Sequence, residues 1–130
     1  MKRLLMEDLI KWKKDRRKPL IIRGARQVGK TWIMKEFGRL HYKNTVYINF
    51  DNNERMKQVF SFDMDIKRIV SALKIEAGKN IDPKDTLLIF DEIQEVPQSL
   101  SSLKYFYENA PEYHIVAAGS LHGVALHAGT

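Results

Sequence analysis

The fold of this chain is decided by the stretch Gly24-Ala25-Arg26-Gln27-Val28-Gly29-Lys30-Thr31. A short apolar run, Leu20 to Ile22, precedes this stretch and ends beside its first glycine, as a buried parallel strand would. Beyond the stretch, apolar residues recur at helical spacing at Ile33, Phe37 and Leu40. The sequence therefore predicts a strand, a glycine-rich loop and a helix in that order.

The two glycines and the Gly-Lys-Thr ending have the spacing of a Walker A phosphate-binding loop. Glycines let the backbone wrap closely around a phosphate group, while the loop amides and the helix N-terminus supply partial positive charge. We expect the whole stretch, Gly24 to Thr31, to bind a nucleotide, with Lys30 reaching the β and γ phosphates and Thr31 binding Mg²⁺. Arg26 and Gln27 have a second interpretation as solvated loop positions.

Two carboxylates, Asp91 and Glu92, follow the apolar run Leu87 to Phe90. Open α/β sheets bind ligands at the carboxyl ends of their strands, so we expect both acids at the same edge as the loop. We assign Asp91 to Mg²⁺, directly or through water, and Glu92 to orienting and deprotonating the attacking water. Transfer of a γ-phosphoryl group depends on both metal charge and a positioned nucleophile.

Apolar runs and helical patterns alternate along the rest of the chain. Further strands are expected at 45–50, 86–90 and 113–118, and further helices at about 3–14, at 66–77 and after Pro97. This alternation predicts an α/β chain with a three-layer P-loop NTPase fold, in which helices cover both faces of a parallel sheet. The expected strand order is first, fourth, third, second. The polar segment 51–65 is the least defined by the sequence.

Polar residues also follow the second and fourth expected strands. Ser120 is our candidate for a sensor of the γ phosphate, because in sheets of this type the fourth strand lies between the other two motif strands. A second interpretation is that Gly119 and Ser120 only form a turn. Asn49 and Asp51 are either groups near the metal or, in the favoured interpretation, residues that form a turn.

The composition is that of a globular protein, with 44% hydrophobic and 29% charged residues, and no apolar run approaches the ~20 residues that span a bilayer. There are no cysteines and no secretory signal pattern, so we expect a cytoplasmic protein with no membrane contact. The net charge is +6, and residues 1–18 hold eight basic and three acidic residues. We therefore predict a basic amphipathic helix at 1–18 and an ATPase core at 19–130.

Four motifs resemble those of a family of prokaryotic AAA-type ATPases. They are Gly-Ala-Arg-Gln-Val-Gly-Lys-Thr, Tyr-Ile-Asn-Phe-Asp, Leu-Ile-Phe-Asp-Glu-Ile-Gln and Gly-Ser-Leu-His-Gly-Val-Ala-Leu-His. The resemblance implies ATP rather than GTP, a Walker A motif at 24–31, a Walker B motif at 87–92 and a sensor at Ser120. Members are typically much longer, with a final core strand, a lid and a C-terminal domain that looks nuclease-like. The resemblance thus implies an N-terminal part of such a protein, without the last core strand and without a match to the arginine finger of the wider superfamily.

Two functions fit these features. The first is Mg²⁺-dependent ATP hydrolysis, catalysed with Glu92, Lys30 and Ser120 and coupled to conformational control of a fused or bound partner. The second is a non-catalytic or slow ATP-binding switch in DNA-related or defence processes. A protein partner or a homo-oligomer is compatible with both, whereas the basic segment before Pro19 gives only weak support for nucleic acid, since such a flank is usually solvated.

Overall fold

A computed structural model gives the structure of the chain and describes residues 2–15, 18–23 and 29–120. The elements in chain order are α1 (Lys2–Asp15), β1 (Leu20–Arg23), α2 (Lys30–His41), β2 (Asn44–Asn49), α3 (Glu54–Phe62), α4 (Ile66–Ala77), β3 (Thr86–Asp91), the 3-10 helix η1 (Ile93–Glu95), α5 (Pro97–Asn109) and β4 (His114–Gly119).

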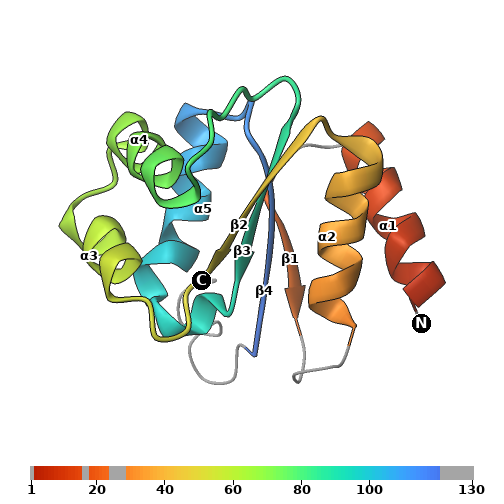
Figure 1. The fold of residues 1–130 in the computed structure, drawn as a ribbon, viewed down its shortest axis with the longest axis horizontal. Coiled ribbons are helices and arrows are strands. Elements are labelled where there is room, and N and C mark those ends of the chain that lie inside the picture. Colours follow the sequence, from red (N-terminus) through yellow and green to blue (C-terminus); the bar gives the residue numbers. More distant parts are fainter. Residues whose placement is uncertain (1, 16–17, 24–28, 121–130) are drawn as a thin grey trace.

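The four strands form one parallel sheet in the order β1-β4-β3-β2 (Figure 1). This order confirms the expected arrangement, in which the strand before the glycine-rich loop is separated from the strand of the acidic pair. Strand β4 lies between them, and its Val116 pairs with Leu20 of β1 on one side and with Ile89 of β3 on the other. The carboxyl ends of all four strands therefore meet at one edge of the sheet.

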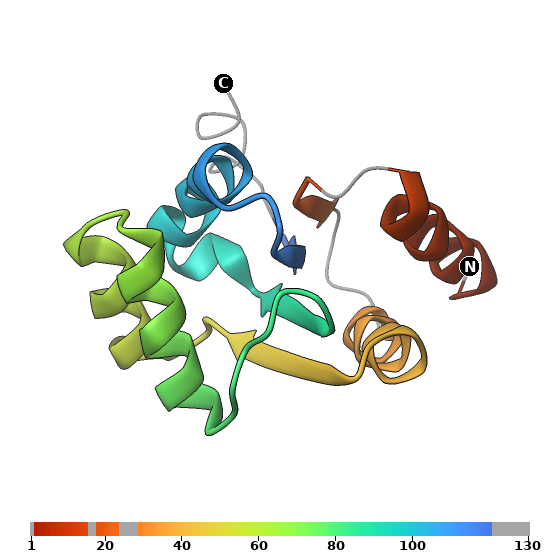
Figure 2. The same ribbon diagram turned by 90° about the horizontal axis from the view of Figure 1, so that it is seen from above.

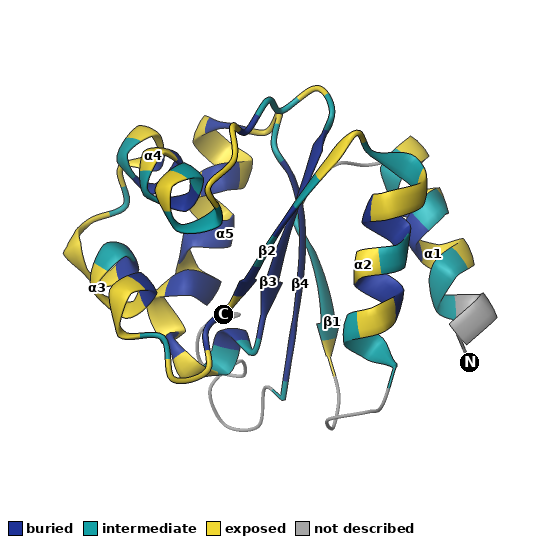
Figure 3. Cartoon of the chain, viewed as in Figure 1, coloured by how far each residue is buried: buried dark blue, intermediate teal, exposed yellow. Residues whose placement is uncertain are grey.

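Helices cover both faces of this sheet, which confirms the three-layer fold. Helices α1 and α2 lie on one face and α3, α4 and α5 on the other (Figure 1, Figure 2). Strand β3 is buried along its whole length, and its side chains alternate between two apolar cores: Leu87 and Ile89 face α1 and α2, whereas Leu88 and Phe90 face the other three helices. The central strands are dark blue in Figure 3, while the outer faces of the helices are exposed.

The helix boundaries follow local capping chemistry. The Asn53 side chain accepts a hydrogen bond from the backbone N–H of Met56 at the start of α3. The Asp65 side chain does the same for Lys67 at the start of α4, and Gly78, the residue that follows α4, has φ of 67°. The left-handed conformation at this position favours glycine, because glycine has no Cβ.

Helix α3 lies inside the polar segment whose structure the sequence left undefined. Met56 and Phe60, one helical turn apart, are its buried residues, and their side chains enter the core beside Phe90. Leu40 of α2, which shares the helical spacing of Ile33 and Phe37, is 54% exposed, and Tyr107 of α5 is 49% exposed. Helices α2 and α5 form where the sequence predicts them, but only some of their apolar side chains face the sheet.

Helix α1 packs into the core beside α2. Leu9 is fully buried, and Trp12 contacts Phe37 of α2 with ring centroids 6.3 Å apart. The Trp12 indole N–H also donates a hydrogen bond to the carbonyl of Lys18 at 2.6 Å. Within the described residues, no helix has both the length and the apolar character that crossing a membrane requires.

The two phenylalanines of α3 offer a matched test of this packing. Phe60 is fully buried and Phe62 is 77% exposed. We expect Phe60→Ala to lower the free energy of unfolding by about 3–5 kcal/mol, because it leaves a cavity among aromatic rings. Phe62→Ala should cost less than about 1 kcal/mol, the scale of its exposed contact with the Arg68 guanidinium. Urea denaturation measures both, and equal losses would contradict the assigned packing.

Candidate active site

The residues predicted to carry the chemistry come from three element ends at the carboxyl edge of the sheet, the lower edge in Figure 1. Gly29, Lys30 and Thr31 lie at the start of α2, Asp91 ends β3 and is followed by Glu92, and Ser120 follows β4. The remaining loop residues lie outside the described part of the chain: Gly24, Ala25, Arg26, Gln27 and Val28.

The junction between the loop and α2 requires a glycine. Gly29 has φ of 100°, a conformation that residues with a side chain rarely adopt. Its carbonyl accepts the first helical hydrogen bond, from the N–H of Ile33 at 2.9 Å. Helix α2 therefore starts at Lys30, and the amides of its first turn face out of the helix N-terminus.

The Asp91 carboxylate joins three parts of the chain. Its Oδ2 accepts hydrogen bonds from the Thr31 hydroxyl and from the Tyr47 hydroxyl, both at 2.7 Å. Its Oδ1 accepts one from the backbone N–H of Glu92 at 2.9 Å. Asp91 is only 5% exposed, so these donors replace the water that a carboxylate would otherwise bind. The structure thus brings together Thr31 and Asp91, the two predicted metal ligands.

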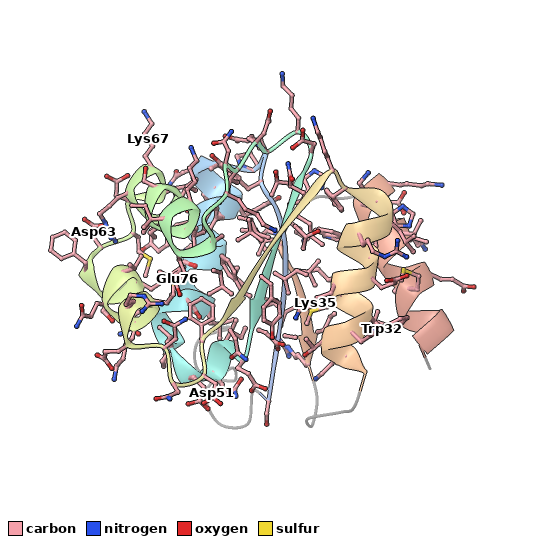
Figure 4. The ribbon with its side chains drawn as sticks, in the orientation of Figure 1. Trp32, Lys35, Asp51, Asp63, Lys67 and Glu76 are labelled. Carbon is pink, nitrogen blue, oxygen red and sulfur yellow. The ribbon has the colours of Figure 1, made fainter. Side chains whose placement is uncertain are left out.

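Tyr47 is a site residue that the sequence analysis missed. It lies in the middle of β2 and is half-buried, and the Lys35 ammonium of α2 lies 4.1 Å from its ring centroid. Lys35 is labelled in Figure 4. Burial raises the pKa of the Tyr47 hydroxyl, and the hydrogen bond to Asp91 raises it further. Tyr47 therefore stays protonated and remains a hydrogen-bond donor to Asp91 throughout the physiological range.

Glu92 adopts a strained backbone conformation. Its φ of 55° and ψ of 45° are left-handed, which costs a residue with a side chain about 1–2 kcal/mol. The turn is closed by η1, in which the N–H of Glu95 donates to the carbonyl of Glu92 at 3.1 Å. The Gln94 carboxamide holds the Glu92 side chain, with Nε2 donating to Oε1 at 2.7 Å. Such strain is typical of functional sites, where surrounding structure fixes an unusual conformation.

The other polar residues at this edge have separate roles. Ser120 is partly buried and directly follows β4, the strand between β1 and β3. Asn49 forms a turn, as the favoured interpretation predicted: its Oδ1 accepts a hydrogen bond from the N–H of Asp51, and its carbonyl accepts one from the Asn53 side chain. The side chain of Asp51 is exposed beyond this turn (Figure 4).

The donor set fits a hard cation shared with a nucleotide. Mg²⁺ in phosphate sites is typically bound by one or two protein oxygens together with water and phosphate oxygens. One hydroxyl and one carboxylate, Thr31 and Asp91, match that requirement. Within the described residues, no cluster of three or more histidine, aspartate or glutamate side chains could hold a metal by itself.

Two features, the fold and the cluster at the carboxyl edge, define a three-layer α/β domain of the P-loop NTPase type. The chain belongs to the AAA domain family, whose model matches residues 16–130. Membership in this family indicates a nucleotide-binding, ATPase-like function. No curated protein matches the chain in sequence.

The raised pKa of Tyr47 leads to a prediction about pH. Because the folded chain disfavours tyrosinate, this residue stabilises the fold below its unfolded pKa of about 10, and that stability is lost as the pH rises above it. Tyr47→Phe should therefore reduce the loss of stability above pH ~10. The difference in tyrosinate absorbance between the unmodified and Tyr47→Phe proteins should have its midpoint above that pH.

Asp91→Asn provides the control for the cause of this shift. Removing the Asp91 charge should move the Tyr47 midpoint down, while the part of the shift caused by burial remains. A midpoint at or below pH ~10 in the protein with Asp91 intact would contradict the assigned contact.

Proposed function

We propose that this chain binds Mg-ATP and hydrolyses it in a Mg²⁺-dependent reaction, and that the reaction controls the conformation of a fused or bound partner. The observation that carries the proposal is the 2.7 Å hydrogen bond from Thr31 to Asp91, which joins the end of the glycine-rich loop to the end of β3 across 60 positions of sequence. Membership in the AAA domain family supports the choice of ATP.

The phosphates are assigned to Gly24 to Thr31. Support comes from the left-handed Gly29 and from the first amides of α2, which provide partial positive charge beside the loop. Lys30, the first residue of α2, adds a full positive charge for the β and γ phosphates. A lysine ammonium suits this role because it acts as a compact point charge.

The metal is assigned to Thr31 and Asp91. When bound, Mg²⁺ supplies the positive charge that offsets the β and γ phosphate oxygens. The Thr31 proton is directed to Asp91, so the lone pairs of the hydroxyl oxygen remain available for the metal. Tyr47 shares Oδ2 of Asp91 with Thr31 and holds this carboxylate in place.

The chemical step is assigned to Glu92, Lys30 and Ser120. Glu92 takes a proton from the attacking water while the water oxygen bonds to the γ phosphorus. The bond between this phosphorus and the β–γ bridging oxygen breaks, and ADP is released. Ser120 senses the γ phosphate from the end of β4. This division of roles is supported by the placement of Glu92 directly after Asp91, whose Oδ1 accepts a hydrogen bond from the backbone N–H of Glu92.

The role of Lys30 can be tested by nucleotide affinity. In the full-length protein, Lys30→Ala should weaken Mg-ATP binding at least about tenfold, because the loop amides alone cannot neutralise the phosphates. Lys67→Ala is the matched control, since this lysine lies on the outer face of α4 (Figure 4). Calorimetry that gives the two variants the same affinity would remove the phosphate-loop assignment.

The acidic pair separates binding from chemistry. Glu92→Gln should keep most of the ATP affinity while hydrolysis falls by roughly a hundredfold or more, the usual scale for the loss of a general base. Asp91→Asn should instead impair both turnover and the Mg²⁺ dependence of binding, because Asp91 is assigned to the metal.

Steady-state hydrolysis and nucleotide affinity, measured in parallel over a range of Mg²⁺ concentrations, distinguish these results. Asp51→Asn serves as the control, because this carboxylate is exposed near the same edge. Hydrolysis at the unmodified rate by the Glu92→Gln protein would exclude Glu92 as the base.

A further inference from the structure

The Gln94 carboxamide lies between the Glu92 side chain and the end of β4. Its Nε2 donates to Glu92 Oε1 at 2.7 Å and approaches Glu95 Oε2 at 3.4 Å. Turning the amide over would set its carbonyl oxygen against the Glu92 carboxylate oxygen, two acceptors with no proton between them. The hydrogen bond to Glu92 therefore fixes the orientation of the amide, with Nε2 toward Glu92 and Oε1 on the opposite side.

The other end of the amide, Gln94 Oε1, is buried and has no hydrogen-bond partner. Among the described residues that are not exposed, it is the one buried side-chain oxygen or nitrogen atom in this condition. A buried acceptor without a donor is unfavourable, and such groups in folded proteins call for a functional or structural explanation. Here the orphaned oxygen lies against Gly119, the residue before Ser120.

Because Gly119 has no Cβ, it leaves the space that this oxygen occupies. A Cβ atom at position 119 would lie 2.2 Å from Gln94 Oε1 and 3.1 Å from the backbone nitrogen of Ile93. The end of β4 thus packs directly on both the backbone of η1 and the side chain of Gln94. Any shift of this strand end changes the room available to the carboxamide.

The backbone of the turn after β3 is held in place by buried contacts. Ile93 is fully buried, and the Ser99 hydroxyl contacts the carbonyls of Ile93 and Val96 at 3.3 and 2.7 Å. The N–H of Val96 also donates to the carbonyl of Ile93. With the backbone fixed in this way, the hydrogen bond from Gln94 Nε2 to Oε1 restricts the orientation of the Glu92 carboxylate.

We propose that Gln94 is a positioning residue that holds the Glu92 carboxylate for catalysis and couples it to the end of β4 at Gly119 and Ser120. The inference rests on the proposed function, since it concerns how the assigned base is oriented. Contact between Ser120 and a γ phosphate would be transmitted through Gly119 to Gln94, and from Gln94 to Glu92. Holding one carboxylate oxygen limits the rotation of the base, and small errors in position reduce rates strongly.

Gln94→Met tests the positioning role in the full-length protein. Methionine keeps the length of the side chain but removes both the donor to Glu92 and the orphaned oxygen. We expect kcat to fall about tenfold or more, ATP affinity to stay within about twofold, and the melting temperature not to fall, because an unsatisfied buried acceptor is lost. A purely structural residue would instead lower the melting temperature and the affinity together with kcat.

Gly119→Ala tests the coupling to β4. Alone, it should lower kcat while ATP affinity is retained, because the new methyl group displaces the Gln94 carboxamide. In a protein that already carries Gln94→Ala, adding Gly119→Ala should change kcat by less than about twofold, since the displaced group is gone.

A measurement without nucleotide completes the test. The side-chain amide signals of Gln94 in a ¹⁵N-labelled sample can be assigned by their loss in Gln94→Met. We expect them to shift in both Glu92→Gln and Gly119→Ala, because each change alters a direct contact of that amide.

The outcomes separate this inference from the proposed function. If the unmodified protein hydrolyses ATP but Gln94→Met keeps its kcat, or if the Gly119→Ala and Gln94→Ala effects multiply independently, the positioning role is wrong and the ATPase assignment stands. If the unmodified protein fails to bind or hydrolyse Mg-ATP, both are overturned.

Discussion

The burial of one carboxylate, that of Asp91, constrains the arrangement around it. Removing an ionised group from water costs several kcal/mol unless donors replace the lost solvent. Those donors are the Thr31 hydroxyl, the Tyr47 hydroxyl and the N–H of Glu92. Each belongs to a different element, so the requirement for donors fixes the start of α2, the register of β2 on β3 and the turn into η1 together. A shift of β2 by one residue would turn Tyr47 to the opposite face of the sheet and leave Asp91 short of a donor.

The topology explains why this cluster can serve a nucleotide. Because β4 separates β1 from β3, the loop strand and the strand of Asp91 lie about 10 Å apart, twice the spacing of neighbouring strands. The glycine-rich loop leaves β1, and α2 then returns so that Thr31 reaches Asp91 across that distance. In the proposed function, a nucleotide at this edge would contact the loop on one side and the acidic pair on the other.

The sequence predicted the parts that depend on local patterns. The apolar runs identified all four strands, and the glycine-rich stretch together with the acidic pair predicted the strand order that the structure has. Helix α3 escaped because its apolar residues, Met56 and Phe60, lie one turn apart within a polar segment. Tyr47 escaped for a different reason: an aromatic residue in a strand usually belongs to the core, and its contact with Asp91 depends on a register between strands 44 positions apart. Gln94 stood inside a quoted motif, but its role depends on the close approach of Gly119, which no local pattern encodes.

The site combines unfavourable features that the adjoining core can stabilise. Glu92 is left-handed and Gln94 has a buried oxygen without a partner, each a cost of about 1–3 kcal/mol. Beside them, Phe90 packs edge to face against Phe50, Phe60 and Phe106, and such ring pairs contribute about 0.5–1.5 kcal/mol each beyond burial. Phe90 is adjacent to Asp91 in β3, so the aromatic cluster anchors the strand end where the strain is located. The end of β3 is therefore rigid, and the strained turn after it is held in place. Side chains can still move, so a contact at the end of β4 can reorient the Glu92 side chain without unfolding the strand and turn that carry it.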